Sequence, residues 1–208
     1  GRGSGAATVL ATHLTRLYEE PVYGLGILPG SDEGGLYTLN AARSFQTFVR
    51  EVDNLIVFDN ESWRHTGESL GQGYAGINEE LVRRLAVLFG AGEVDDGGAV
   101  GESVVDASEI INTLGSGGVS TIGYAVDHIE REKGGLFSRF SKKELDETDT
   151  TNRITSLVRK AALGRLTLPC ELNGAERGLL VTAGPPEYLN RKGIKHGRRW
   201  LEEQTGSM

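Results

Sequence analysis

The sequence has 208 residues, of which 38% are hydrophobic and 25% charged, a balance typical of a folded globular chain and not of a disordered one. Its formal net charge of −7 disfavours general nucleic-acid binding, which requires a basic face. The single cysteine, Cys170, excludes an internal disulfide framework, and no apolar run approaches the roughly 18 residues of a membrane span.

The chain opens with glycines at positions 1, 3 and 5, and a helical pattern follows over residues 6–19. Glycines ahead of a helix leave backbone N–H groups free to bind an anion, and the helix dipole favours negative charge there. Residues 1–5 are therefore a candidate phosphate loop. The alternative is a glycine-rich turn that serves packing alone.

Helices and strands alternate over the next part of the chain. Apolar runs predict buried strands at 22–28 and 52–58, with a helix at 37–49 between them. This order predicts parallel pairing in an α/β layer. The later elements expected in chain order are helices at 69–89 and 106–114, a strand at 119–125, a charged loop at 130–152, a helix at 151–163, strands at 166–172 and 178–183, and a helix at 186–204.

Four short motifs resemble the nucleotide-binding segments of the tubulin/FtsZ superfamily. Gly3-Ser4-Gly5-Ala6-Ala7 resembles the end of the glycine-rich signature around the GTP phosphates, and Val57-Phe58-Asp59-Asn60-Glu61 resembles a strand-end segment. Tyr74-Ala75-Gly76-Ile77-Asn78 is similar to the step that holds guanine in tubulins, and Asp106-Ala107-Ser108-Glu109 resembles the synergy loop. Within the superfamily, the run Tyr23-Gly24-Leu25-Gly26-Ile27-Leu28-Pro29-Gly30 looks most like the archaeal CetZ family.

This resemblance implies an α/β fold: a GTPase domain with a parallel, Rossmann-like sheet, joined by a central helix to an α+β C-terminal domain. It divides the chain into the second half of the GTPase domain (1–105), a linking helix with the synergy loop (106–118) and a partial C-terminal domain (119–208). Both domains are then expected to be incomplete. Because an incomplete sheet exposes edges, we expect such a fragment to be poorly stable and to aggregate.

The resemblance implies that the nucleotide is bound by seven residues: Gly3, Ser4, Gly5, Glu33, Asn60, Tyr74 and Asn78. Glu33 would bind the ribose hydroxyls. Tyr74 and Asn78 are four residues apart and share one helix face, where a ring can stack on a base and an amide can both donate and accept. Asn60 follows a strand end, where open α/β sheets bind ligands. The alternative is that Tyr74 only packs and both asparagines cap turns.

Asp106 and Glu109 are the candidate catalytic residues. Their spacing also fits a capping box at a helix start. The resemblance implies instead that these acids polarise the water that attacks GTP on the neighbouring subunit. Hydrolysis then requires head-to-tail assembly, and such a heterologous contact builds filaments. The histidines show no metal-binding spacing, so no protein metal site is expected.

The function implied by the resemblance is that of a cytoplasmic, cytoskeletal GTPase in control of archaeal cell shape. It would bind GTP or GDP, with Mg²⁺ as a candidate companion ion, and polymerise with itself, while the fragment alone is expected to be inactive. One alternative is an FtsZ-like cell-division GTPase. Another is a catalytically weak, nucleotide-bound filament protein, since Arg2 replaces a Thr and Val104 an Asn of the family motifs. A dinucleotide enzyme would need a G-x-G-x-x-G turn, which residues 1–7 lack.

Overall fold

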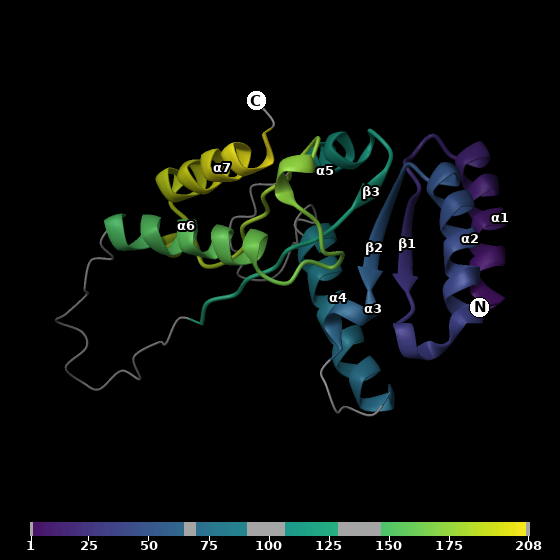
Figure 1. Cartoon of the computed structure of the whole chain (residues 1–208). Helices are drawn as coiled ribbons and strands as arrows, with labels where there is room; N and C mark the ends of the chain where they lie inside the picture. Colours follow the sequence, from purple (N-terminus) through teal and green to yellow (C-terminus); the bar gives the residue numbers. More distant parts are fainter. Residues whose placement is uncertain (1, 65–69, 91–106, 129–146, 207–208) are drawn as a thin grey trace, which may run out of the picture.

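A computed structural model describes residues 2–64, 70–90, 107–128 and 147–206 (Figure 1). The first part contains α1 (Arg2–Leu17), β1 (Tyr23–Leu28), η1 (Ser31–Glu33), α2 (Gly35–Glu51), β2 (Asn54–Asp59), α3 (Asn60–Trp63) and α4 (Leu70–Gly90). The second contains α5 (Ala107–Leu114), β3 (Val119–Ser120), α6 (Glu147–Leu163), η2 (Leu172–Gly174), η3 (Pro186–Tyr188) and α7 (Arg191–Thr205).

The described strands form one parallel sheet in the order β1-β2-β3. The register pairs Tyr23 with Asn54 at one edge and Leu28 with Asp59 at the other, while Leu55 of β2 pairs with Val119 of β3. The consecutive residues 54–58 of β2 are all buried. Because successive side chains of a strand point to opposite sides of the sheet, both faces of this central strand are covered. The predicted parallel α/β layer is confirmed.

Helices cover both faces of this sheet (Figure 1). On one face, Leu55 and Val57 of β2 lie in a core with Ala11 of α1 and the apolar side of α2. On the other face, Phe58 packs with Ile77 of α4 and its neighbours. Phe45 and Val49 of α2, which belong to the apolar pattern that predicted this helix, pack against the core, whereas Val9, Leu10 and Leu17, the pattern that predicted α1, are exposed and Ala11 docks that helix.

An irregular segment closes the end of the sheet next to β3. The backbone N–H of Asp59 donates to the Thr167 carbonyl (2.8 Å), and the Thr167 N–H donates to the Ile122 carbonyl (3.0 Å). Thr167 is fully buried, and its hydroxyl accepts a hydrogen bond from the Ile122 N–H (2.9 Å). The chain around Thr167 thus joins the end of β2 to the chain that follows β3.

The helices α6 and α7 pack closely against each other (Figure 1). A Cβ atom added at Gly193 would lie 2.8 Å from Ile154 Cδ1, and one at Gly197 would lie 2.7 Å from Val158 Cγ2. Asn190 fixes the start of α7, since its side chain accepts a hydrogen bond from the Gly193 N–H (2.6 Å). The two glycines allow the helix axes to approach.

Several sequence-based boundaries were wrong. The predicted strand at 119–125 shortens to the two residues of β3, and 166–172 and 178–183 form no strands. Strand propensity is local, whereas a ladder requires a neighbouring strand to supply its hydrogen bonds. The predicted loop at 130–152 overlaps α6 from Glu147 onward, and its residues 130–146 lie outside the described ranges. The helix predicted at 186–204 divides into η3 and α7 at the Asn190 cap.

The first helix also begins earlier than expected, at Arg2, so Gly3, Ser4 and Gly5 form its first turn and not a preceding loop. Among the described helices, none combines the length and the apolar character that crossing a bilayer requires.

Candidate functional site

The candidate site lies where β1 and β2 end. Leu28 and Asp59, the last residues of the two strands, are register partners. Glu33 follows β1 in η1, and Asn60 directly follows β2 as the first residue of α3. The sheet therefore brings these two predicted residues to the same edge, the usual ligand-binding edge of an open parallel sheet.

Glu33 contacts Tyr74 across this edge. A hydrogen bond to the Glu33 carboxylate, with burial second, raises the pKa of the Tyr74 phenol above its ordinary value. Glu33 Oε1 also accepts a hydrogen bond from the Gly30 N–H (2.8 Å), which holds the carboxylate against the turn. Two residues that the sequence assigned to the ribose and the base are thus direct neighbours.

The turn that carries Glu33 is tied to α3. The Ser31 N–H donates to Glu61 Oε2 (2.6 Å), and Asp32 forms an ion pair with Arg64. This ion pair lowers the pKa of Asp32, chiefly through the side-chain hydrogen bond. The loops that follow β1 and β2 therefore hold each other in place.

Asn60 is buried, with 6% of its surface exposed, and its Oδ1 atom has no hydrogen-bond partner among the described residues. An unsatisfied buried acceptor costs about 1–3 kcal/mol. Asn78 is exposed on α4, one turn after the half-buried Tyr74. Asn60 thus offers an acceptor that the described part of the fold leaves unused.

The glycines of the first turn of α1 lie toward the same edge. The helix has 16 residues, about 24 Å in length, and in Figure 1 its N-terminal end is level with the arrowheads of β1 and β2. The first N–H groups of a helix have no acceptor within the helix. A Cβ atom at Gly3 or Gly5 would meet no atom of the described residues within 4 Å, so packing in this part of the structure does not require either glycine.

Glu109 lies at the opposite edge of the sheet. It is exposed on α5, whose residues Ile110 and Leu114 pack against Tyr23, the first residue of β1. The Leu114 carbonyl also accepts a hydrogen bond from Asn54 Nδ2, at the start of β2 (3.1 Å). A strand of 6 residues separates the two edges by roughly 20 Å. Asp106, the other predicted catalytic acid, lies outside the described residues.

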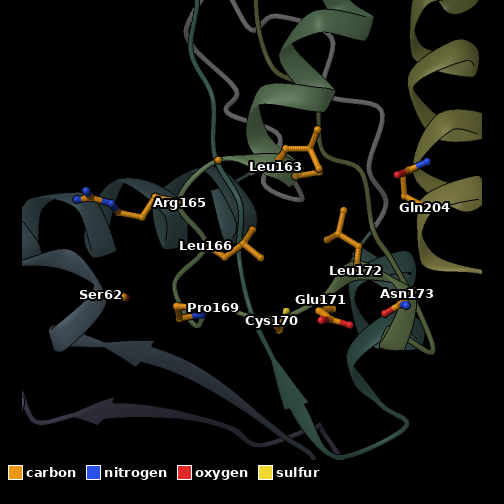
Figure 2. A pocket seen from close by; sticks show the side chains of 12 residues that line it. Ser62, Leu163, Arg165, Leu166, Pro169, Cys170, Glu171, Leu172, Asn173 and Gln204 are labelled. Carbon is orange, nitrogen blue, oxygen red and sulfur yellow. The ribbon is translucent and has the colours of Figure 1, made fainter.

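A half-open hollow of about 690 Å³ lies elsewhere, between α3 and the ends of α6 and α7 (Figure 2). Its lining includes Ser62, Leu166, Cys170, Glu171 and Gln204, and none of the predicted nucleotide ligands. Figure 2 shows the Arg165 side chain extending away from the labelled residues of η2. No motif in the sequence indicated this hollow, because distant segments form it.

Known proteins with this fold define its class. The solved structure of CetZ1 from Haloferax volcanii, a GDP-bound monomer, matches 100% of this chain and 54% of its own with 66% identity and a TM-score of 0.84. That of CetZ2 from the same organism, a GTPγS-bound protofilament, matches 100% of this chain and 55% of its own with 41% identity and a TM-score of 0.78. The fold is therefore the α/β fold of tubulin-like proteins, as predicted.

Sequence comparison narrows the class to one family. The family model described as the C-terminal domain of tubulin-like CetZ matches residues 67–208. Tubulin-like protein CetZ1 of Haloferax volcanii is 72% identical over 216 residues, which cover 100% of this chain and 55% of that protein. The chain belongs to the CetZ family of tubulin-like proteins. It spans about half the length of the curated relatives that it matches.

Proposed function

We propose that the full-length protein is a cytoskeletal GTPase that binds guanine nucleotide and assembles head to tail. The observation that carries the proposal is the separation of the predicted residues. Glu33, Asn60 and Tyr74 lie at one edge of the sheet, and Glu109 lies at the other. One edge supplies groups suited to a nucleoside, and the other supplies an exposed acid that cannot reach that edge within one subunit.

The nucleotide-binding edge supplies complementary chemistry. The Glu33 carboxylate is an acceptor for ribose hydroxyls, and the Tyr74 ring offers a face for stacking. Guanine presents N1–H and N2–H donors, which suit the unused Asn60 Oδ1. The N-terminal turn of α1, which contains Gly3, Ser4 and Gly5, suits a phosphate because a helix N-terminus favours an anion. The relatives whose solved structures hold GDP and GTPγS agree with this class of ligand.

Head-to-tail assembly follows from the position of α5. A second copy stacked along the strand direction would bring Glu109, together with Asp106, to the nucleotide of the first copy. Such a contact is heterologous and does not close, so it generates a filament. The CetZ2 structure that is a protofilament supports this arrangement. There the acids would orient and polarise the water that attacks the γ-phosphate, and GDP would leave as the bond between the β- and γ-phosphates breaks.

The finer expectations remain predictions. They include Mg²⁺, hydrolysis at the subunit junction, a cytoplasmic role in cell shape, and the division of the chain into 1–105, 106–118 and 119–208. Among the described residues, no group of three His, Cys, Asp or Glu side chains could hold a metal ion. Mg²⁺ would therefore be held mainly by the nucleotide phosphates.

Complementation between two impaired variants tests the proposal. Asn60→Ala weakens a nucleotide contact, and Glu109→Gln removes an acid that serves the neighbour, so at a GTP concentration too low to saturate Asn60→Ala a mixture should turn over more GTP than the two variants do separately. Turnover per subunit of the unaltered protein should rise with its concentration. A flat specific activity, with no gain on mixing, would contradict hydrolysis at a shared site. Filaments without turnover would favour the catalytically weak alternative.

A further inference from the structure

Trp63 connects the nucleotide-binding edge to the rest of the fold. It is the last residue of α3, the four-residue helix that begins with Asn60. The indole is 7% exposed, its Nε1 donates to the Leu166 carbonyl (3.1 Å), and its ring lies 5.2 Å from that of Phe58. Trp63 is therefore held by the end of β2 and by the segment that follows α6.

Arg84 of α4 lies over this indole, with its guanidinium carbon 4.4 Å from the ring centroid. It is 4% exposed, and it donates to Glu80 Oε2 (2.7 Å) and to the Glu80 carbonyl (2.8 Å). Its buried Nε has no hydrogen-bond partner among the described residues. A buried arginine that leaves a donor unused is a poor choice for stability alone, since apolar replacements of buried ion pairs are often as stable.

The same contacts fix α3 relative to α4. Trp63 shares a core cluster with Ile77 and Leu81 of α4. Ile77 lies between Tyr74 and Asn78 in the sequence, within the predicted base-binding turn. The orientation of Trp63 therefore sets where the start of α3 lies relative to that turn.

We propose that Trp63 and Arg84 are positioning residues for recognition of the guanine base. Their stacked pair holds Asn60 at the distance from Tyr74 and Asn78 at which one base can contact both helices. The inference rests on the proposed function and adds to it the residues that determine base specificity. Neither residue touches the nucleotide.

Affinity for GDP relative to IDP tests this role, because hypoxanthine lacks the 2-amino group that an acceptor at Asn60 would bind. In the full-length protein, Arg84→Met keeps the length of the side chain but removes the nearer of two guanidinium groups over the indole, leaving that of Arg165, 5.2 Å from the ring centroid. We expect the ratio of GDP to IDP affinity to fall about tenfold, the contribution of roughly one hydrogen bond. Arg84→Lys retains a cation over the ring and should restore part of the ratio.

The matched control is Arg159→Met, which removes the guanidinium that lies 5.5 Å from the Trp200 ring on α6 and α7, away from the predicted base. It should leave the ratio unchanged. Indole fluorescence provides a second measurement. Addition of GDP should change the emission of the Trp200→Phe variant, which keeps Trp63. The separate Trp63→Phe variant, which keeps Trp200, should show no such change.

An unchanged GDP to IDP ratio in folded Arg84→Met would overturn the inference, as would a fluorescence response that survives Trp63→Phe. If Arg84→Met does not fold, Trp63→Phe decides the matter, because a GDP to IDP ratio equal to that of the unaltered protein would then reject the positioning role. Absence of GDP binding by the unaltered protein is a separate outcome, which would overturn the proposed function itself.

Discussion

Two buried asparagines at the two ends of β2 are used differently. Asn54 is 3% exposed, and its Nδ2 donates to the carbonyls of Leu114 (3.1 Å) and Gly117 (3.3 Å), which ties the strand to the turn after α5. Asn60, at 6% exposed, holds an acceptor that no described residue uses. The buried Oδ1 of Asn54 likewise has no partner among the described residues, so what sets Asn54 apart is the pair of hydrogen bonds that its Nδ2 donates to the fold. Burial alone does not distinguish a structural amide from a candidate ligand.

The largest effect is expected for Glu109, the exposed acid at the edge of the sheet where β1 and β2 begin. Glu109→Gln should lower GTP turnover by about 100-fold, within the range for loss of a general acid or base. Nucleotide affinity should stay the same, because Glu109 lies a strand length from the binding edge of its own subunit. Steady-state turnover and GDP affinity measure the two effects. A loss of affinity equal to the loss of turnover would show that the two edges are not separate.

Asn54→Ala should reduce the free energy of unfolding by roughly 1–3 kcal/mol, because it removes the two hydrogen bonds by which Nδ2 holds the Leu114 and Gly117 carbonyls. Urea denaturation measures the loss. GDP affinity of the folded variant should be that of the unaltered protein, and a weaker affinity without loss of stability would reverse the roles of the two asparagines.

Asn60→Ala is the matched change at the other end of the strand. It should weaken GDP binding by about tenfold, because one hydrogen bond to the base is lost. It should leave the free energy of unfolding nearly unchanged, since the deleted Oδ1 has no partner in the described fold. Calorimetric titration and urea denaturation give both values, and a large loss of stability with normal GDP binding would contradict the assignment.

Gly5→Ala should change stability and GDP affinity in opposite directions at the edge of the sheet where Asn60 lies. The added methyl group meets no described atom within 4 Å, and alanine is favoured over glycine in a helix by roughly 0.5–1 kcal/mol. We therefore expect slightly higher thermal stability together with weaker binding of GDP. Higher stability with unaltered binding would remove this turn from the phosphate site.

The smallest effect is a shift in titration. Since the Glu33 hydrogen bond raises the pKa of Tyr74, the phenol of the folded protein should ionise above its ordinary range. Its contribution to stability is complete below the unfolded-state pKa and is lost as pH rises through the folded-state pKa. Glu33→Gln should return the pKa toward its ordinary value. Ultraviolet titration of the tyrosinate follows this, with Tyr37→Phe, at an exposed position, as the control.

Some of the site could be predicted because short motifs carry it. Tyr74 and Asn78 share a helical spacing, and Asn60 follows an apolar run that predicted a buried strand. Trp63 and Arg84 carry no such signal, because they are neighbours only after α3 folds back onto α4. The role of Asn54 was equally hidden, since its acceptors are the backbone carbonyls of Leu114 and Gly117.

The family, the long helices and the two strands β1 and β2 could be predicted from the sequence, because motifs and apolar periodicity are local properties, although the face that this periodicity marked on α1, with Val9, Leu10 and Leu17, is exposed. Tertiary structure decided the rest. Residues 166–172 and 178–183 form no strands, since a strand needs a neighbouring strand to supply its hydrogen bonds and local propensity cannot provide one. The tertiary structure also joined Glu33 to Tyr74 and separated both from Glu109, because parallel strands gather their ends at two opposite edges of one sheet.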